Sequence, residues 1–216
     1  LPAAVACEFM AAGFDLLDAG DDRVSSSADV SLPVYAGGMT LLWSAQELLL
    51  RLDCAAERRV RAAAILARAC RRTLAAQIQD VALRGQAPAS AETVLAVLHR
   101  RSGTLVAAPC QCAVALHGGS RHALALAGRF GMALGGAAQL EDDLADLAAD
   151  AAGGRQTLPT ALAALHPREP ELVTAITWVL IQRFLREAAV ALDRLSPYCR
   201  RPEVLWTRLP PALRIG

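Results

Sequence analysis

The stretch Gly135-Gly-Ala-Ala-Gln139-Leu-Glu-Asp142-Asp143-Leu-Ala-Asp146 places a compact group of carboxylates at the end of a long apolar segment. Ala and Leu dominate that segment, and both are strong helix formers. Residues three or four positions apart lie on one face of a helix, so Asp142 and Asp143 each share a face with Asp146. Carboxylates on adjacent turns suit Mg²⁺, which is typically held by one or two carboxylates, water and substrate phosphates. The stretch therefore predicts a helix that ends in a candidate magnesium site.

A second acidic cluster follows another apolar segment near the start of the chain. It contains Asp15, Asp18, Asp21 and Asp22. Taken alone, either cluster favours a solvated acidic face at a helix end. Two clusters, each at the end of an apolar helix, favour another arrangement, in which antiparallel helices bring both to one mouth of a bundle and bridging metals clamp a diphosphate.

The composition predicts an all-α protein with one domain spanning residues 1–216. The 216 residues are 54% hydrophobic but only 4% aromatic, and the β-branched and aromatic residues that favour sheets are scarce. Helices are expected at about residues 3–17, 34–52, 55–83, 90–100, 103–116, 120–149, 158–165 and 169–195. An irregular segment is expected over residues 20–32, and a kink at Gly135-Gly136.

Charge and hydropathy exclude several other classes of protein. Twenty-two basic residues balance 21 acidic ones, so no general attraction to nucleic acid is expected. The long uncharged stretches contain Pro and Gly and are better explained as core helices than as membrane spans. Six scattered cysteines favour reduced thiols in a cytoplasmic protein, and the spacing of Cys110 and Cys112 matches no standard zinc pattern.

Several segments resemble motifs of the trans-isoprenyl (polyprenyl) diphosphate synthases, in the order that family shows. The opening stretch resembles the second aspartate-rich motif, G-x-x-x-Q-x-x-D-D-x-x-D. Three further matches are Ala76-Gln77-Ile-Gln-Asp80 with G-Q-x-x-D, Arg101-Ser-Gly-Thr-Leu with K-T-G-x-L, and Gly154-Arg155-Gln-Thr-Leu-Pro with G-K-x-T-L-P. Glu8 stands ten residues before Asp18, the family's spacing to its first motif, D-D-x-x-D. The resemblance implies an isoprenoid synthase-type helical bundle, shortened, with N-terminal helices missing or truncated.

The resemblance also implies roles for the matching residues. The catalytic and metal-binding carboxylates would be Asp18, Asp22 and Asp142, joined as Mg²⁺ ligands by Asp143 and Asp146. The groups that contact substrate diphosphate would be Arg23, Arg101, Gln139 and Arg155. Arg replaces the family's Lys at positions 101 and 155, and it can form bidentate, charge-assisted bonds to phosphate. For Gln77 and Asp80, a polar contact between packed helices is favoured over a role in the site.

The departures from the family pattern fall on one side of the predicted site. Ala19 stands where the first motif has its second Asp, and Gly20 disfavours a continued helix. Of the R-R-G that follows this motif only Arg23 is present, and the G-K-x-x-R-P segment that helps to bind isopentenyl diphosphate would lie before Leu1. The residues that bind the allylic diphosphate in the family are therefore better preserved in this sequence than those that bind isopentenyl diphosphate.

Three functions follow from these features. The leading hypothesis is a prenyltransferase that condenses an allylic diphosphate with isopentenyl diphosphate through Mg²⁺-assisted ionisation. A synthase-like terpene cyclase or lyase needs only the ionisation and tolerates a lost isopentenyl site. The third hypothesis is a non-catalytic regulatory subunit of a heteromeric prenyl synthase. The resemblance implies a homodimer, and the third hypothesis a heterodimer with a complete synthase.

Overall fold

The computed structural model describes residues 2–24, 31–207 and 209, and among these the side chains at 20–24 and 31 are not described. The described residues form helices and connecting turns without strands, which confirms the predicted all-α class. The elements are α1 (Pro2–Val24), α2 (Ser31–Leu50), α3 (Ala56–Leu83), α4 (Ala91–Leu98), the π-helical turn η1 (His99–Gly103), α5 (Thr104–Leu116), α6 (Arg121–Ala145), α7 (Leu147–Ala152), α8 (Leu158–Leu165), α9 (Pro170–Leu195), the 3₁₀ turn η2 (Ser196–Tyr198) and α10 (Pro202–Trp206).

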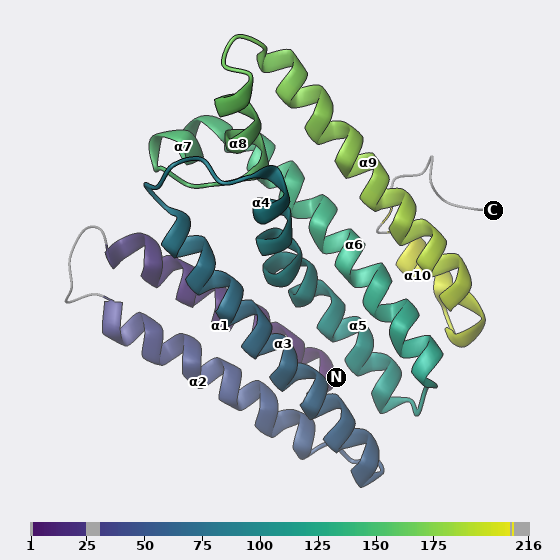
Figure 1. The fold of residues 1–216 in the computed structure, drawn as a ribbon. Helices are drawn as coiled ribbons and strands as arrows, with labels where there is room; N and C mark the ends of the chain where they lie inside the picture. Colours follow the sequence, from purple (N-terminus) through teal and green to yellow (C-terminus); the bar gives the residue numbers. More distant parts are fainter. Residues whose placement is uncertain (1, 25–30, 208, 210–216) are drawn as a thin grey trace.

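The long helices lie side by side with alternating direction (Figure 1). One apolar core joins α1, α2, α3 and α5, and its largest fully buried side chains are Met10, Leu49 and Leu66. A second core joins α4, α6, α8 and α9 around Phe130 and Ile181. Because α1, α3 and α6 run in the same direction, their carboxyl ends lie at the same end of the bundle (Figure 1). The negative ends of three helix dipoles therefore meet where the acidic motifs lie.

Most predicted helices are confirmed, and two predicted breaks are wrong. Helix α1 continues through Gly20 to Val24, where an irregular segment was expected from residue 20; residues 25–30 lie outside the described part. Helix α6 is continuous across Gly135 and Gly136 and ends instead at Ala145, followed by the C-cap residue Asp146, whose φ and ψ are −95° and 9°. Both glycines are buried against neighbouring elements, so tertiary packing outweighs their low helix propensity.

Local signals at two turns agree with the sequence. The Ser90 hydroxyl accepts a hydrogen bond from the Thr93 N–H at 3.2 Å, which confirms the predicted N-cap of α4. Gly85 and Gly154 adopt φ values of 68° and 66°, and the Gly85 N–H bonds the Gly154 carbonyl at 3.2 Å. This bond ties the turn after α3 to the loop after α7. No described helix is both long and apolar enough to cross a membrane.

Candidate functional site

Polar side chains from several elements meet at the end of the bundle where α1, α3 and α6 finish. Asp18 comes from the last turns of α1, Asp80 from those of α3, and Arg101 from η1, while α6 contributes Gln139 and Asp143. The short π-helical turn that carries Arg101 is a form of helix often found at functional sites. We call this group, together with Ser102, the polar site.

Arg101 is the centre of the charge arrangement. Its guanidinium group forms ion pairs with Asp18 and with Asp80, the latter at 3.3 Å from Nη1 to Oδ2. Arg84 lies 3.6 Å from the same Asp80 oxygen. All these side chains are at most one-third exposed, so their charges are screened less than surface charges are. Arg101 therefore crosslinks the helices that carry the first aspartate cluster and the Gln77–Asp80 segment.

A chain of hydrogen bonds connects η1 with the second aspartate cluster. The Ser102 hydroxyl donates to Gln139 Oε1 at 2.6 Å, and Gln139 Nε2 donates to Asp143 Oδ1 at 2.8 Å. Burial raises the pKa of the Asp143 carboxyl to about 7; the Gln139 hydrogen bond and Arg101 act against this, and Asp150 and Asp80 add to it. Asp143 is thus positioned inside the bundle, while its charged form is disfavoured.

The three carboxylates of the second cluster do not face the same surroundings. Asp142 and Asp146 are exposed, whereas Asp143 is buried, so the predicted common face is formed by Asp142 and Asp146. The Asp146 N–H still bonds the Asp142 carbonyl at 2.9 Å, which keeps the two residues one turn apart. The difference arises because Asp143 points toward Gln139 and the neighbouring helices.

The donor set suits a magnesium ion that keeps several waters. Among the described side chains, no group of three His, Cys, Asp or Glu is arranged to hold a metal ion. Mg²⁺ needs only one or two carboxylates besides water and phosphate oxygens, and Asp142 and Asp146 offer two exposed carboxylates on one face. Of the other predicted ligands, Asp18 is paired with Arg101 and Asp143 is buried. The side chains of Asp22 and Arg23 lie outside the described part.

The loop after α7 carries Arg155 at the edge of the polar site. Its backbone N–H donates to the Asp150 carbonyl at 2.9 Å, and its Nε lies 3.9 Å from Asp150 Oδ1. Burial raises the pKa of the Asp150 carboxyl, and Arg155 opposes that shift. Gln156 fixes the same loop, because its amide donates to the Gln86 and Ala87 carbonyls and accepts from the Ala89 N–H at 2.6 Å.

Several residues of this site have larger roles than their sequence patterns predicted. Asp80 pairs with two arginines, so it is more than the packing residue that was favoured. Ser102 holds the Gln139 side chain in place, and Gln156 holds the loop that carries Arg155. All three lie inside the motif matches, and that position was the available signal. A cavity of about 30 Å³ between Asp80, Arg101 and Asp143 has room for little more than a water molecule, so a diphosphate requires the exposed side of the site.

The fold is that of the isoprenyl diphosphate synthases. The chain is 21% identical to a geranylgeranyl pyrophosphate synthetase from the archaeon Geoglobus acetivorans, with a TM-score of 0.77, over 89% of this chain and 71% of that one. A polyprenyl synthetase from Streptomyces coelicolor A3(2) is 23% identical, with a TM-score of 0.68, over 89% and 72%. A polyprenyl synthase from Caulobacter crescentus CB15, complexed with calcium and isoprenyl diphosphate, is 21% identical, with a TM-score of 0.63, over 97% and 73%.

The sequence itself identifies the family. A sequence model described as polyprenyl synthetase matches residues 22–157, and the chain belongs to the polyprenyl synthetase family. The matched range contains Asp80, Arg101 and the complete second aspartate-rich motif. No curated protein sequence matched the chain. Family and fold together indicate a transferase similar to polyprenyl diphosphate synthases.

Proposed function

We propose that the protein is a prenyltransferase that condenses an allylic diphosphate with isopentenyl diphosphate. The observation that carries this proposal is the arrangement around Arg101, which links Asp18 and Asp80 at the end of the bundle where the second aspartate-rich motif also finishes. The isoprenyl diphosphate and calcium bound by the Caulobacter crescentus relative support the same class of substrate and a divalent cation.

In the proposed reaction, the C1–O bond of the allylic diphosphate breaks and diphosphate leaves with the bonding electrons. The double bond of isopentenyl diphosphate then forms a bond to C1, and loss of a proton restores an alkene. Mg²⁺, when bound, neutralises the leaving group. Asp142 and Asp146 would hold it, with Asp18 and Asp22 from the first cluster.

Two arginines are proposed to bind the same leaving diphosphate. Arg101 and Arg155 would donate to the oxygens of the allylic diphosphate, which requires the guanidinium group of Arg101 to exchange a carboxylate for a phosphate. Through its two hydrogen bonds, the Gln139 side chain keeps the Ser102 hydroxyl and the Asp143 carboxyl in fixed positions. Fixed donors at the point where negative charge develops are usually the largest electrostatic contribution to such a reaction.

The Asp142→Ala variant is expected to release diphosphate at least about a hundred times more slowly than the wild type, because it removes an exposed ligand from the predicted metal site. Protein with Mg²⁺ receives geranyl or farnesyl diphosphate, with and without isopentenyl diphosphate, and diphosphate release is measured. The matched control is Glu141→Ala, which removes an exposed carboxylate next to Asp142 and outside the motif positions.

The same assay separates the proposed reaction from the two alternatives. Release that requires isopentenyl diphosphate supports chain elongation, and release without it supports a terpene cyclase or lyase. Absence of release from folded protein contradicts an autonomous enzyme. That result would favour a regulatory subunit, in which Ala19 and the pairing of Arg101 with Asp18 leave the site inactive.

The paired helices α2 and α3 support a proposed homodimer. Large apolar side chains are exposed along both helices: Leu32, Trp43 and Leu50 on α2, and Val60 and Ile78 on α3. Trp43 is 68% exposed and Ile78 72%. Leu32, Trp43 and Leu50 are eleven and seven positions apart and so share one face of α2, and apolar residues exposed along one helix face are typical of a protein–protein interface.

The Trp43→Asp variant is therefore expected to convert a dimer into a monomer, because a carboxylate would be buried in an apolar interface. Size-exclusion chromatography with light scattering gives the mass. Trp178→Asp is the matched control, since Trp178 is 45% exposed on α9, away from α2 and α3. A wild-type monomer, or an unchanged mass for Trp43→Asp, would contradict this interface.

A further inference from the structure

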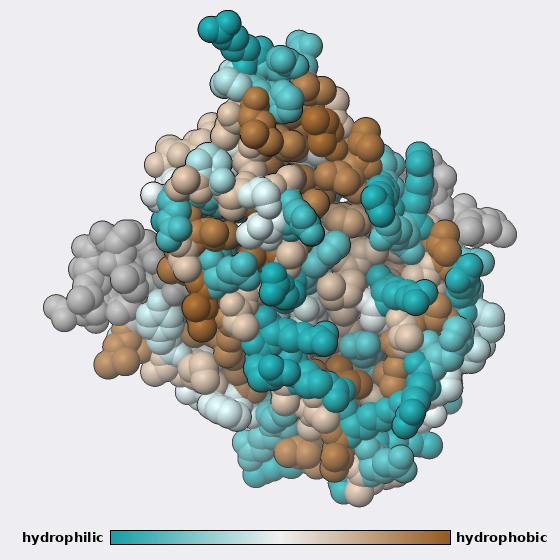
Figure 2. Space-filling view, viewed as in Figure 1, coloured by the Kyte–Doolittle hydropathy of each residue, from teal (hydrophilic) through white to brown (hydrophobic). Residues whose placement is uncertain are grey.

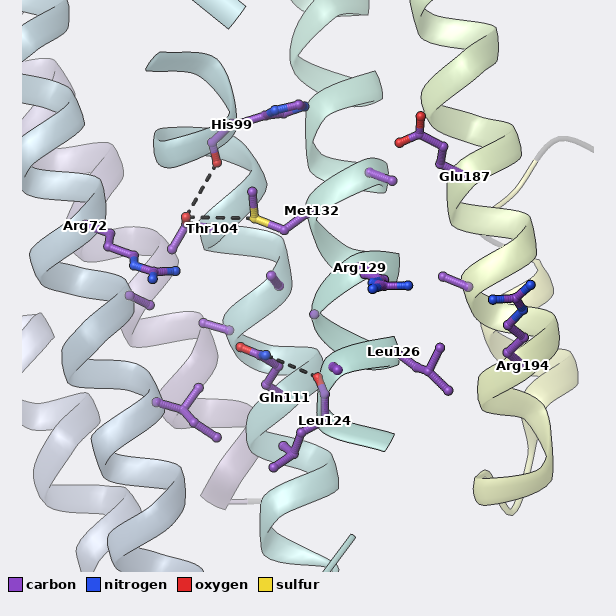
Figure 3. A pocket seen from close by; sticks show the side chains of 18 of the residues that line it. Arg72, His99, Thr104, Gln111, Leu124, Leu126, Arg129, Met132, Glu187 and Arg194 are labelled. Atoms are coloured by element: carbon purple, nitrogen blue, oxygen red, sulfur yellow. Dashed lines mark hydrogen bonds between the residues drawn. The ribbon is translucent and has the colours of Figure 1, made fainter. Parts of the chain in front are cut away.

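A groove of about 1100 Å³ lies on a different part of the bundle from the polar site. Helices α3 and α9 form its two walls, and α5 and α6 form its floor (Figure 3). Among the described side chains, no carboxylate of the polar site and no residue of α1 lines it. In the space-filling view, strongly hydrophilic side chains border a hollow with paler and apolar residues at its base (Figure 2).

The groove concentrates positive charge in a chain whose net charge is only +1. Arginines line both walls: Arg61, Arg68 and Arg72 on α3, and Arg183, Arg186 and Arg194 on α9. Helix α6 adds Arg121 and Arg129. Among the lining residues in the described part of the chain, Glu187 is the one acidic side chain. More than a third of the chain's 22 basic residues therefore surround this groove.

Most of these arginines lack a carboxylate partner within the described part of the chain. Arg183 pairs with Glu187 at 3.0 Å, and Arg61 donates to the Gly119 carbonyl at 3.1 Å. The other six form no ion pair with any described residue. In Figure 3, Arg72 and Arg194 extend from opposite walls toward the space beside Arg129. Like charges placed together without a counter-charge repel, and an anionic occupant would remove that repulsion.

The charges are spread along the groove and do not gather at one point. Arg61 and Arg72 lie eleven positions apart, as do Arg183 and Arg194, and eleven positions are about 16 Å along a helix axis. A single phosphate headgroup would engage only part of this length. Between the walls, the floor is mixed: apolar side chains such as Ala107, Ala108 and Leu126 lie beside Arg129 of α6. The occupant that fits is therefore extended, apolar on one side and acidic along both flanks.

We propose that this groove binds an acidic amphipathic α-helix of a partner protein. Three turns of helix are about 16 Å long, which matches the extent of the arginine rows. The apolar stripe of such a helix would lie on α5 and α6, and its Asp or Glu side chains would form bidentate bonds with guanidinium groups on α3 and α9. This inference is independent of the proposed prenyltransferase activity, because it uses none of the residues of the polar site.

The test uses a fluorescently labelled, stapled helical peptide with Leu and Ala on one face and Glu on both flanks. Its binding to the full chain is followed by anisotropy and compared with that of the same peptide carrying Gln in place of Glu. The acidic peptide is expected to bind at least about tenfold more tightly at low salt, and the difference should shrink at 0.3 M NaCl. Equal binding of the two peptides would overturn the proposal.

Charge reversal locates the binding site. Arg72→Glu, Arg129→Glu and Arg194→Glu together are expected to weaken binding of the acidic peptide at least about tenfold and to strengthen binding of a Lys-flanked peptide. The matched control combines Arg58→Glu, Arg71→Glu and Arg200→Glu, which are exposed arginines outside the groove. An equal loss in the control would overturn the proposal.

Two further arms complete the test. Circular dichroism verifies that both triple variants are folded. If the groove triple variant is unfolded, the single variant Arg129→Glu replaces it, and its affinity for the acidic peptide is expected to fall about threefold. Sodium tripolyphosphate is titrated in parallel as a small polyanion. Binding of tripolyphosphate that depends on the three groove arginines, without binding of the acidic peptide, would assign the groove to a small anion and overturn the helix proposal.

Discussion

Gly131→Ala is expected to destabilise the protein by about 3 kcal/mol, because a methyl group at this position has no space. A Cβ on Gly131 would lie 2.4 Å from the Ala107 Cα and 2.7 Å from the Val106 carbonyl oxygen. These are backbone atoms of α5, so relief requires α5 and α6 to move apart. Helix α5 belongs to one apolar core and α6 to the other, and both helices line the groove. Urea unfolding followed by circular dichroism measures the loss.

Gly37→Ala is the matched control, because it also adds one methyl group to a glycine inside a helix. A Cβ there would meet only the Leu16 Cδ1 atom, at 3.6 Å, which is an ordinary contact. The change is expected to stabilise α2 by about 0.5–1 kcal/mol through helix propensity. If Gly131→Ala unfolds at the same urea concentration as the wild type, the close approach of α5 and α6 is wrong.

The unfolding free energy of the wild type is expected to fall as the pH rises, and Asp143→Asn is expected to remove this pH dependence. Because burial raises the pKa of the folded carboxyl from 3.8 to about 7, folding favours its protonated form. The stabilising contribution is complete below pH 3.8 and is lost as the pH rises through 7. Three pKa units correspond to about 4 kcal/mol, so at pH 8 the variant should exceed the wild type in unfolding free energy by up to about that amount.

The measurement compares urea unfolding of the wild type and Asp143→Asn at pH 4 and pH 8, with a chelator present, because a bound cation would favour the charged carboxylate. The two proteins should differ little at pH 4. Asp142→Asn serves as the control, since Asp142 is exposed and should keep the pH dependence of the wild type. A pH dependence that Asp143→Asn leaves unchanged would contradict the burial of the ionisable group.

The helices were predictable because their signals are local. The end of α3 and both boundaries of α5 and α8 follow from Pro, Gly and Ser nearby in the sequence and from Ala- and Leu-rich interiors. The second aspartate-rich motif was recognisable as a contiguous stretch, and the family match confirms that recognition. The predicted kink at Gly135-Gly136 failed because a glycine's helix propensity is worth only about 1 kcal/mol, which packing against η1 and Phe184 outweighs.

The sequence by itself determined the helical class, the family and four candidate residues of the polar site, Asp18, Arg101, Gln139 and Asp143, because each rests on composition or on short contiguous motifs. Only the tertiary structure decided which carboxylate is buried, that Asp80 shares Arg101 with Asp18, and that arginines of three distant segments line one groove. The physical reason is that ion pairs and burial depend on distances between segments. Asp18 and Arg101 are 83 positions apart, and only the packing of α1, α3 and α5 brings them together.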